Sequence, residues 1–146
     1  MDVRENETRL CETHQFKAIF PKSLNANETL FGGQALEWMD EVAYITATRF
    51  TRQKMFTIKA DNIEFIRPIT PHSIIELIGF LEKIEKVRLT IKVEVFVEEM
   101  YRQGRHKAMQ AAFTFATLNE NHRPKRIDYT LLEQADDQFT QNEGKN

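Results

Sequence analysis

One long stretch without proline or glycine does most to constrain what this chain can fold into. It follows Gly32-Gly33 and runs to about Thr51. Apolar side chains recur in it at three- and four-residue spacing, the period of a helix. One apolar stripe is made of Leu36, Met39, Ala43, Ala47 and Phe50, and a second of Trp38, Val42 and Ile45. A helix that is apolar over so much of its surface must be wrapped by other parts of the chain.

The segments around this helix are predicted to be strands. His14 to Phe20 alternates weakly and ends before Pro21, which cannot donate to a central ladder. Four further strands are predicted after the helix, over residues 56–66, 73–84, 87–97 and 107–118. In 87–97 every odd position is apolar, and Phe96 is the one apolar residue between them. That alternation predicts one buried face and one largely solvated face.

One helix against one antiparallel sheet is an α+β architecture, and a sheet curled around a single apolar helix is called a hotdog fold. We predict a single domain over residues 1–146, with a core of about 12–118 and a polar tail of 119–146. A short helix around Tyr129 to Ala135 is predicted within the tail. Because such a sheet keeps exposed edges, edge-to-edge pairing into a homodimer is expected.

Composition argues against several functional classes. Charged residues make up 29% of the chain and the net charge is −2, so neither nucleic acid nor a membrane is an expected partner. Cys11 is the single cysteine, which rules out an intrachain disulfide and suits a reducing, cytoplasmic location. The polar first ten residues do not look like a secretory signal. The four histidines are scattered, so we expect no metal and no other cofactor.

The chemistry is predicted to lie in residues 21–47. Gly32-Gly33 at a helix start exposes backbone amides that suit a developing negative charge, although an ordinary glycine turn would have the same sequence. Asp40 lies seven residues after Gly33, on the helix face with Leu36 and Ala43. Burying a carboxylate there costs several kcal/mol unless it is paired or hydrated, so a functional role would explain its presence. Asp40 is therefore a candidate general base or nucleophile, and a helix-surface acid such as Glu41 is the alternative.

Residues 21–47 resemble the acyl-CoA thioesterases of the hotdog fold, in particular bacterial short-chain and cytosolic brain-type acyl-CoA hydrolases. The resemblance extends over about 12–118 and includes Thr57, the run Phe65 to Pro68 and the strand Phe113 to Thr117. It implies hydrolysis of acyl-CoA to a free acid and CoA, without a cofactor. It also implies a site to which one protomer contributes Asn25 and the Gly-Gly turn, and its partner Asp40.

Spacing agrees with a shared site, because seven helical residues rise about 10.5 Å. Gly33 and Asp40 of one chain are therefore too far apart to contact one carbonyl group. Asn25 would orient the water or the thioester; the alternatives are that it only forms a turn, or that Asn27 takes this role. A hexamer built of dimers is an open alternative to the dimer.

The substrate is expected to meet Gly32, Thr57 and the segment Lys86-Val87-Arg88, where the family usually has glycine followed by serine or threonine. Arg123, with Lys125 and Arg126, would meet the phosphates of CoA; an ordinary solvated tail is the alternative. A module that binds acyl-CoA without cleaving it is the competing function. A hydratase of the same fold is disfavoured, because no histidine closely follows the Gly-Gly turn.

Overall fold

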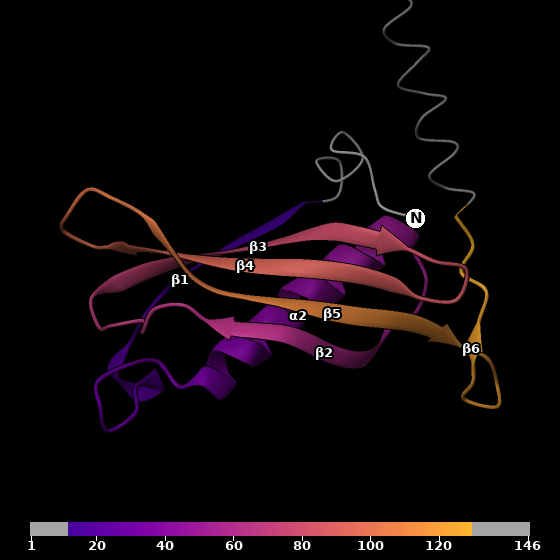
Figure 1. Cartoon of the computed structure of the whole chain (residues 1–146), viewed down its shortest axis with the longest axis horizontal. Helices are drawn as coiled ribbons and strands as arrows, with labels where there is room; N and C mark the ends of the chain where they lie inside the picture. Colours follow the sequence, from indigo (N-terminus) through magenta and orange to yellow (C-terminus); the bar gives the residue numbers. More distant parts are fainter. Residues whose placement is uncertain (1–11, 130–146) are drawn as a thin grey trace, which may run out of the picture.

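The computed structural model describes residues 12–129, which form one long helix and one antiparallel sheet (Figure 1). In chain order the elements are β1 Thr13–Ala18, the 3-10 helix η1 Pro21–Ser23, α2 Gly32–Thr51, β2 Phe56–Phe65, β3 Ser73–Ile84, β4 Leu89–Glu99, β5 His106–Leu118 and β6 Pro124–Lys125. α2 ends where Arg52 turns into the left-handed region, at φ 55°. No helix within the described residues is long and apolar enough to cross a membrane.

The strand order in the sheet is β1-β3-β4-β5-β2, and the two-residue β6 pairs with the end of β5. β2 follows the helix directly, yet it pairs with β5 and not with its neighbour in sequence, β3. β1 and β2 are therefore the two edges of the main sheet. All the strand pairs are antiparallel.

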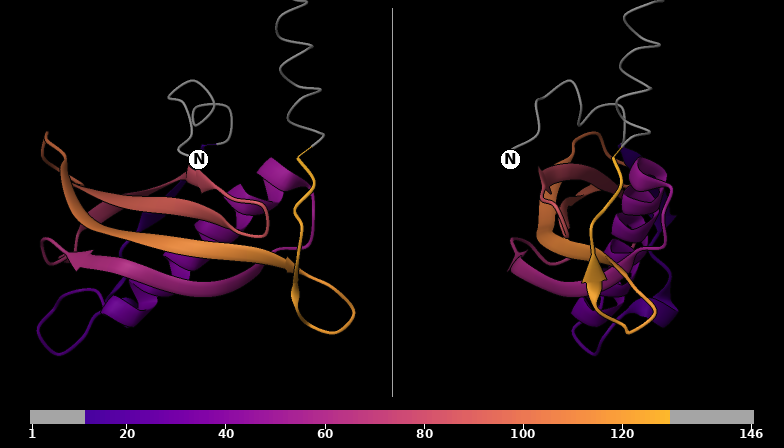
Figure 2. Two further views of the ribbon diagram at one scale, coloured as in Figure 1. Left: turned by 45° about the vertical axis from the view of Figure 1, so that its right-hand side comes forward. Right: turned by 90° about the vertical axis from the view of Figure 1, so that its right-hand side faces the viewer.

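The sheet curves around α2, as the end-on view in Figure 2 shows. Met39, Val42 and Ala43 of the helix are completely buried against the inner sheet face. The closest approach is at Gly79 of β3, where an added Cβ would lie 2.6 Å from Thr46 Oγ1. A side chain at position 79 would push the helix away from the sheet, so this glycine sets how tightly the two layers pack.

Most of the predicted elements are confirmed. The helix and the third strand have the predicted limits, and the first strand is Thr13–Ala18 instead of 14–20. The prediction for Val87 is wrong: β4 begins at Leu89, and Val87 lies in the preceding turn with 39% of its surface exposed. Tyr129 is not helical, and the rest of the helix predicted up to Ala135 lies outside the described residues, as does Cys11. Packing continues beyond residue 118, because Ile127 is only 2% exposed.

Candidate active site

Asp40 lies on the side of α2 that faces the edge strand β2. Thr57, the second residue of β2, donates a hydrogen bond from its hydroxyl to Asp40 Oδ1 at 2.9 Å. Asp40 is partly exposed, so it lies at the margin of the buried helix face and not within it, as the sequence had suggested. The reason is that β2 is the outermost strand of the sheet, so no other strand of residues 12–129 covers that side. Glu41, the competing acid, is exposed and has no hydrogen bond or ion pair with a described residue.

The start of α2 offers free backbone amides. The N-cap residue is Phe31, whose side chain makes no capping hydrogen bond. An added Cβ on Gly32 would lie 2.8 Å from the ring of Phe65 at the end of β2, a side chain that is 60% exposed and can turn aside. Nothing lies within 4 Å of the corresponding position on Gly33. An uncapped helix start with open space beside Gly33 is suited to an anion or a developing oxyanion.

Asn25 holds together the loop before the helix. Its Oδ1 accepts hydrogen bonds from the amides of Asn27 at 2.9 Å and Thr29 at 3.2 Å. Its Nδ2 donates to Thr29 Oγ1 at 2.9 Å. These contacts match the turn-forming alternative for Asn25, and they leave one of the two Nδ2 hydrogens for another acceptor. Asn27 is exposed and contributes its backbone to this turn.

Within one chain the predicted catalytic groups do not meet. Gly33 and Asp40 belong to one uninterrupted helix, Gly32–Thr51, so about 10.5 Å of helical rise separates them. Gly32 packs near the last residue of β2, whereas Asp40 bonds to Thr57 near its start. The two halves of the candidate site therefore lie at opposite ends of the same edge strand.

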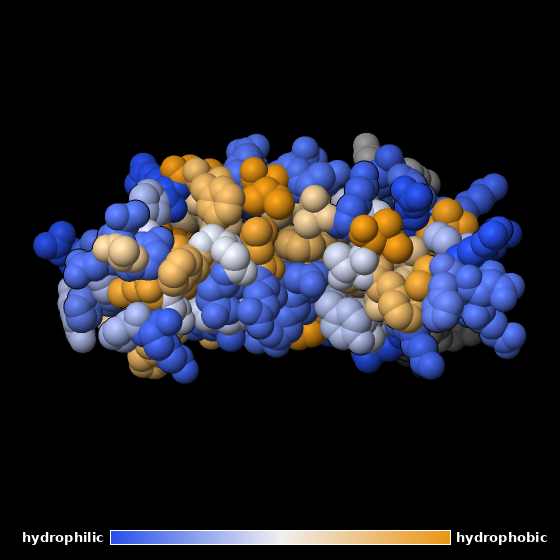
Figure 3. All heavy atoms as spheres, turned by 90° about the horizontal axis from the view of Figure 1, so that it is seen from below, coloured by the Kyte–Doolittle hydropathy of each residue, from blue (hydrophilic) through white to orange (hydrophobic). Residues whose placement is uncertain are grey.

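That edge strand is unusually apolar for a surface that faces solvent. Figure 3, seen from the β2 side of the molecule, shows apolar side chains among the polar ones on this face. The large apolar residues of β2 and the turn after it that are between 38% and 60% exposed are Phe56, Ile58, Ile63, Phe65 and Ile66. An unpaired edge strand with such side chains is a template for pairing with another strand.

The predicted phosphate contacts come together at one end of the sheet. Lys86 and Arg88 lie in the turn between β3 and β4, and Arg123 lies in the turn between β5 and β6. The two segments are linked by a hydrogen bond from the Ile127 amide to the Lys86 carbonyl, at 2.8 Å. The sequence reasoning missed the contribution of Tyr129. The available signal was Ile127 and Tyr129, two large side chains close together in a tail that is mostly polar.

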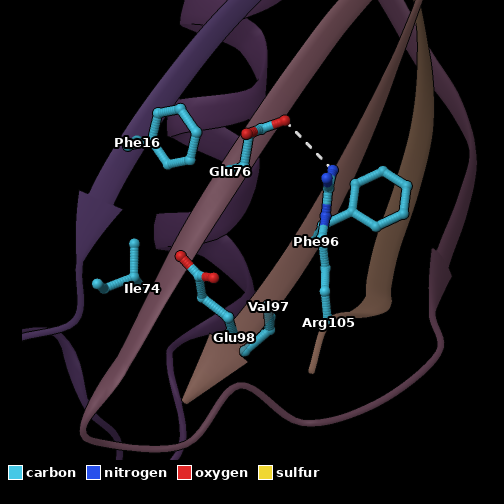
Figure 4. A pocket seen from close by; sticks show the side chains of 7 residues that line it. All are labelled: Phe16, Ile74, Glu76, Phe96, Val97, Glu98 and Arg105. Atoms are coloured by element: carbon cyan, nitrogen blue, oxygen red, sulfur yellow. Dashed lines mark hydrogen bonds and ion pairs between the residues drawn. The ribbon is translucent and has the colours of Figure 1, made fainter. Parts of the chain in front are cut away.

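A hollow lies on the outer face of the sheet, away from the helix (Figure 4). It lies beside Phe16, Ile74 and Phe96, and the ion pair of Arg105 with Glu76 at 3.2 Å crosses it. None of the predicted catalytic residues lines this hollow. Among residues 12–129, no group of three or more potential ligands could hold a metal ion.

One long helix packed on a curved antiparallel sheet, within residues 12–129, defines a protein of the hotdog class. Residues 27–102 match the thioesterase superfamily, and the chain belongs to that superfamily. It is 27% identical over 130 residues to the acyl-CoA thioester hydrolase YkhA of Bacillus subtilis, covering 87% of this chain and 76% of the relative. It is 28% identical over 147 residues to the cytosolic acyl coenzyme A thioester hydrolase of Mus musculus, covering 99% of this chain and 39% of that protein.

Solved structures confirm the predicted fold. A hexameric acyl-CoA thioesterase aligns with a TM-score of 0.77 at 24% identity, covering 82% of this chain and 77% of that one. The broad-specificity hexameric thioesterase HI0827 aligns with a TM-score of 0.71 at 26% identity, covering 78% and 84%. The acyl-CoA hydrolase of Staphylococcus aureus, solved with butyryl coenzyme A, aligns with a TM-score of 0.76 at 19% identity, covering 94% and 92%.

Proposed function

We propose that this protein hydrolyses acyl-CoA thioesters to a carboxylic acid and CoA, at a site shared by two copies of the chain. The observation that carries the proposal is the Asp40 carboxylate, held by Thr57 beside an unpaired apolar edge strand. The names of the relatives support the substrate class. The S. aureus hydrolase has been solved with one aspartate and one threonine, seventeen positions apart, each changed to alanine, and Asp40 and Thr57 have the same separation.

The geometry of β2 supports the shared site. In a twofold dimer the same strand pairs with itself in antiparallel fashion, so the start of one β2 lies beside the end of the other. Thr57 would then lie near the partner subunit's Phe65, which packs against Gly32 of its own chain. Such pairing brings Asp40 of one protomer towards the helix start of the other, and it covers the exposed isoleucine and phenylalanine side chains of both strands.

In this dimer each residue of the site has a separate role in hydrolysis. Asp40 either takes a proton from the attacking water or attacks the thioester carbonyl itself. The hydrogen bond from Thr57 engages Oδ1 and leaves Oδ2 for the reaction. As the carbonyl carbon is attacked, negative charge develops on its oxygen, and the partner's Gly33 amide stabilises that charge. The carbon–sulfur bond then breaks. If Asp40 acts as the base, the leaving sulfur of CoA takes up the proton that Asp40 removed from the water; if Asp40 is the nucleophile, the sulfur takes a proton from water and a second water hydrolyses the anhydride between Asp40 and the acyl group. Asn25 supports the loop that leads into the same helix start.

We further propose a cytoplasmic enzyme whose dimers associate into a hexamer. The location is supported by the cytosolic mouse relative and by the single cysteine. The hexamer is supported by the relatives solved as hexamers. A closed twofold dimer uses up the β2 edges, so the contacts between dimers must use other surfaces.

The test is release of free thiol from a panel of acyl-CoA substrates, with Asp40→Asn and its matched control Glu41→Gln. Asp40→Asn should lower kcat by at least about a hundredfold, since it removes the base or nucleophile and keeps the size of the side chain. Glu41→Gln should stay near wild type. Thr57→Val should cost about tenfold, since it removes only the hydrogen bond to the carboxylate.

Two results would contradict the proposal. If the wild type binds acyl-CoA tightly but releases no thiol, the protein is a module that binds acyl-CoA and not an enzyme. Normal turnover by Asp40→Asn together with loss of activity in Glu41→Gln would move the catalytic carboxylate to the neighbouring residue.

A further inference from the structure

The segment after β5 folds back across one end of the molecule. β6 pairs with the last residues of β5, and Ile127 is then buried to 2% exposure in the hydrophobic core. Tyr129 packs against Phe50 near the end of α2, with ring centroids 6.3 Å apart. We call residues 124–129 the strap. It is an ordered part of the fold, although most of its residues are polar or charged.

The strap is tied to the end of α2. Gln53 Nε2 donates to the carbonyl of Asp128 at 2.6 Å, and the Asp128 amide donates to Gln53 Oε1 at 3.2 Å. A glutamine amide that pairs with both backbone groups of one residue acts as a short piece of sheet. These two hydrogen bonds fix the position of Asp128 relative to the C-terminal end of α2.

The strap is also tied to the turn between β3 and β4. The Ile127 amide donates to the Lys86 carbonyl, and the Tyr129 hydroxyl donates to the Glu85 carbonyl, both at 2.8 Å. Burial and the nearby charge of Glu85 raise the pKa of Tyr129 to about 12. The hydroxyl therefore keeps its proton and remains a donor at any working pH. Two consecutive carbonyls of the turn are held by the strap.

These contacts bring together two groups of basic residues that lie far apart in the sequence. Their exposed side chains are those of Lys86 and Arg88 in the turn, and Arg123, Lys125 and Arg126 in and just before the strap. None of the five forms an ion pair with another described residue; Glu85, whose charge Arg88 also feels, pairs with Lys83 at 3.0 Å. An unpaired group of lysine and arginine is the side-chain chemistry that recognises phosphate.

This basic end lies close to the proposed catalytic carboxylate. Phe115 of β5 pairs with Thr57 on one side and with Leu89 on the other. Two strand spacings, about 10 Å, therefore separate the residue that holds Asp40 from the start of β4, immediately after Arg88. A substrate with a reacting thioester at one end and phosphates at the other could reach both places.

We propose that Tyr129 and Gln53 are positioning residues: they lock the strap to the 85–88 turn, so that both groups of basic residues form one surface for the phosphates of the substrate's nucleotide end. The inference rests on the proposed function, because it takes the phosphate-bearing substrate from it. Neither side chain is proposed to contact the reacting atoms.

The test compares Tyr129→Phe with Tyr101→Phe. The first keeps the ring on Phe50 and removes the hydrogen bond to Glu85; the second changes a tyrosine that is 86% exposed in the turn between β4 and β5. Loss of this one hydrogen bond should raise KM for acyl-CoA about three- to tenfold in Tyr129→Phe, with kcat unchanged. KM for a phosphate-free thioester of the same acyl group should not change. Tyr101→Phe should match wild type with both substrates.

A binding measurement makes the result independent of catalysis. Adenosine 3′,5′-bisphosphate should bind Tyr129→Phe and Gln53→Met more weakly than wild type, with a smaller dependence on salt. Equal losses for the phosphate-free and the CoA substrate would mean a merely structural role and overturn the inference, as would unchanged binding of the bisphosphate. If the wild type binds the bisphosphate through the strap but hydrolyses no thioester, the proposed function fails and the positioning role stands.

Discussion

The two edge strands of the sheet, β1 and β2, differ in length and in exposure. β1 is six residues long, and its neighbourhood is closed by side chains of α2. Arg49 donates to the Glu12 carbonyl at 3.1 Å and to Thr13 Oγ1 at 3.2 Å, and the Lys17 ammonium lies 4.9 Å from the Trp38 ring centre. β2 is ten residues long and exposed over almost its whole length. Within residues 12–129, side chains of α2 hold the shorter edge, and the longer edge is exposed.

The difference supports β2 as the edge at which the proposed dimer would form. Charged side chains and contacts from a helix are the usual means by which an edge strand avoids pairing with other molecules. Both edges carry charged side chains and contact α2, but β2 exposes four large apolar side chains beside the carboxylate of the proposed site, whereas β1 exposes Phe16. The irregular register near Asp61 and Asn62 limits which strands can pair with β2. The exposed edge and the incomplete site thus coincide.

The largest expected effect comes from placing charge on the open edge. The double variant Ile58→Lys/Ile63→Lys should be monomeric by sedimentation and should lose thiol release to background, because each site needs two chains. Phe16→Lys is the matched control: it adds a lysine to the other edge strand at a position that is 61% exposed. The control variant should still form the dimer through β2, and it should keep wild-type activity. A double variant that is monomeric and still active would show that one chain contains a complete site.

A smaller, positive signal is expected from mixing two inactive variants. Asn25→Ala removes the support of the loop before the helix start, and Asp40→Asn removes the carboxylate. In a mixed twofold dimer one site carries both changes and the other carries neither. Subunit exchange at equal amounts should therefore restore roughly a quarter of wild-type activity. Differently tagged chains would prove the exchange, and mixed dimers without activity would refute the shared site.

The smallest effect is expected at the closed edge. The hydrogen bond with Glu12 is the main cause that raises the pKa of His14 above its ordinary value of 6.5; burial opposes it, and Glu76 adds to it. Glu76 is also bonded to Arg105 at 3.2 Å, so that positive charge faces the same cluster. A raised pKa means that the contribution of His14 to stability is complete below pH 6.5 and is lost as the pH rises through the higher folded value.

Thermal unfolding of wild type and His14→Gln measures this contribution. The difference in Tm between them should be largest near about pH 5.5 and should vanish near about pH 8.5. Because the His14 side chain is 43% exposed, the effect on Tm should be small. A difference that grows with pH would contradict the assignment. Thiol release at a fixed pH should be the same in both proteins.

Local pattern was enough to predict the elements. The helical spacing from Gly32 to Thr51 and the alternation over residues 87–97 lead directly to α2 and to most of β4. The reason is that each period is set by the backbone geometry of a few successive residues, so it is visible in the sequence itself. The same alternation placed the start of β4 two residues too early, at Val87, because the turn before the strand has no such period of its own.

The tertiary structure decided which parts meet. The place of β2 beside β5, the hydrogen bond of Thr57 to Asp40 and the strap across the turn all join residues that lie far apart in the chain. The sequence supplied the candidates Asp40, Gly33 and Asn25, because their residue types suit the chemistry at their spacing. Their exposure and partners depend on the order of strands in the sheet. That order follows from the packing of the whole chain around α2, and no local period encodes it.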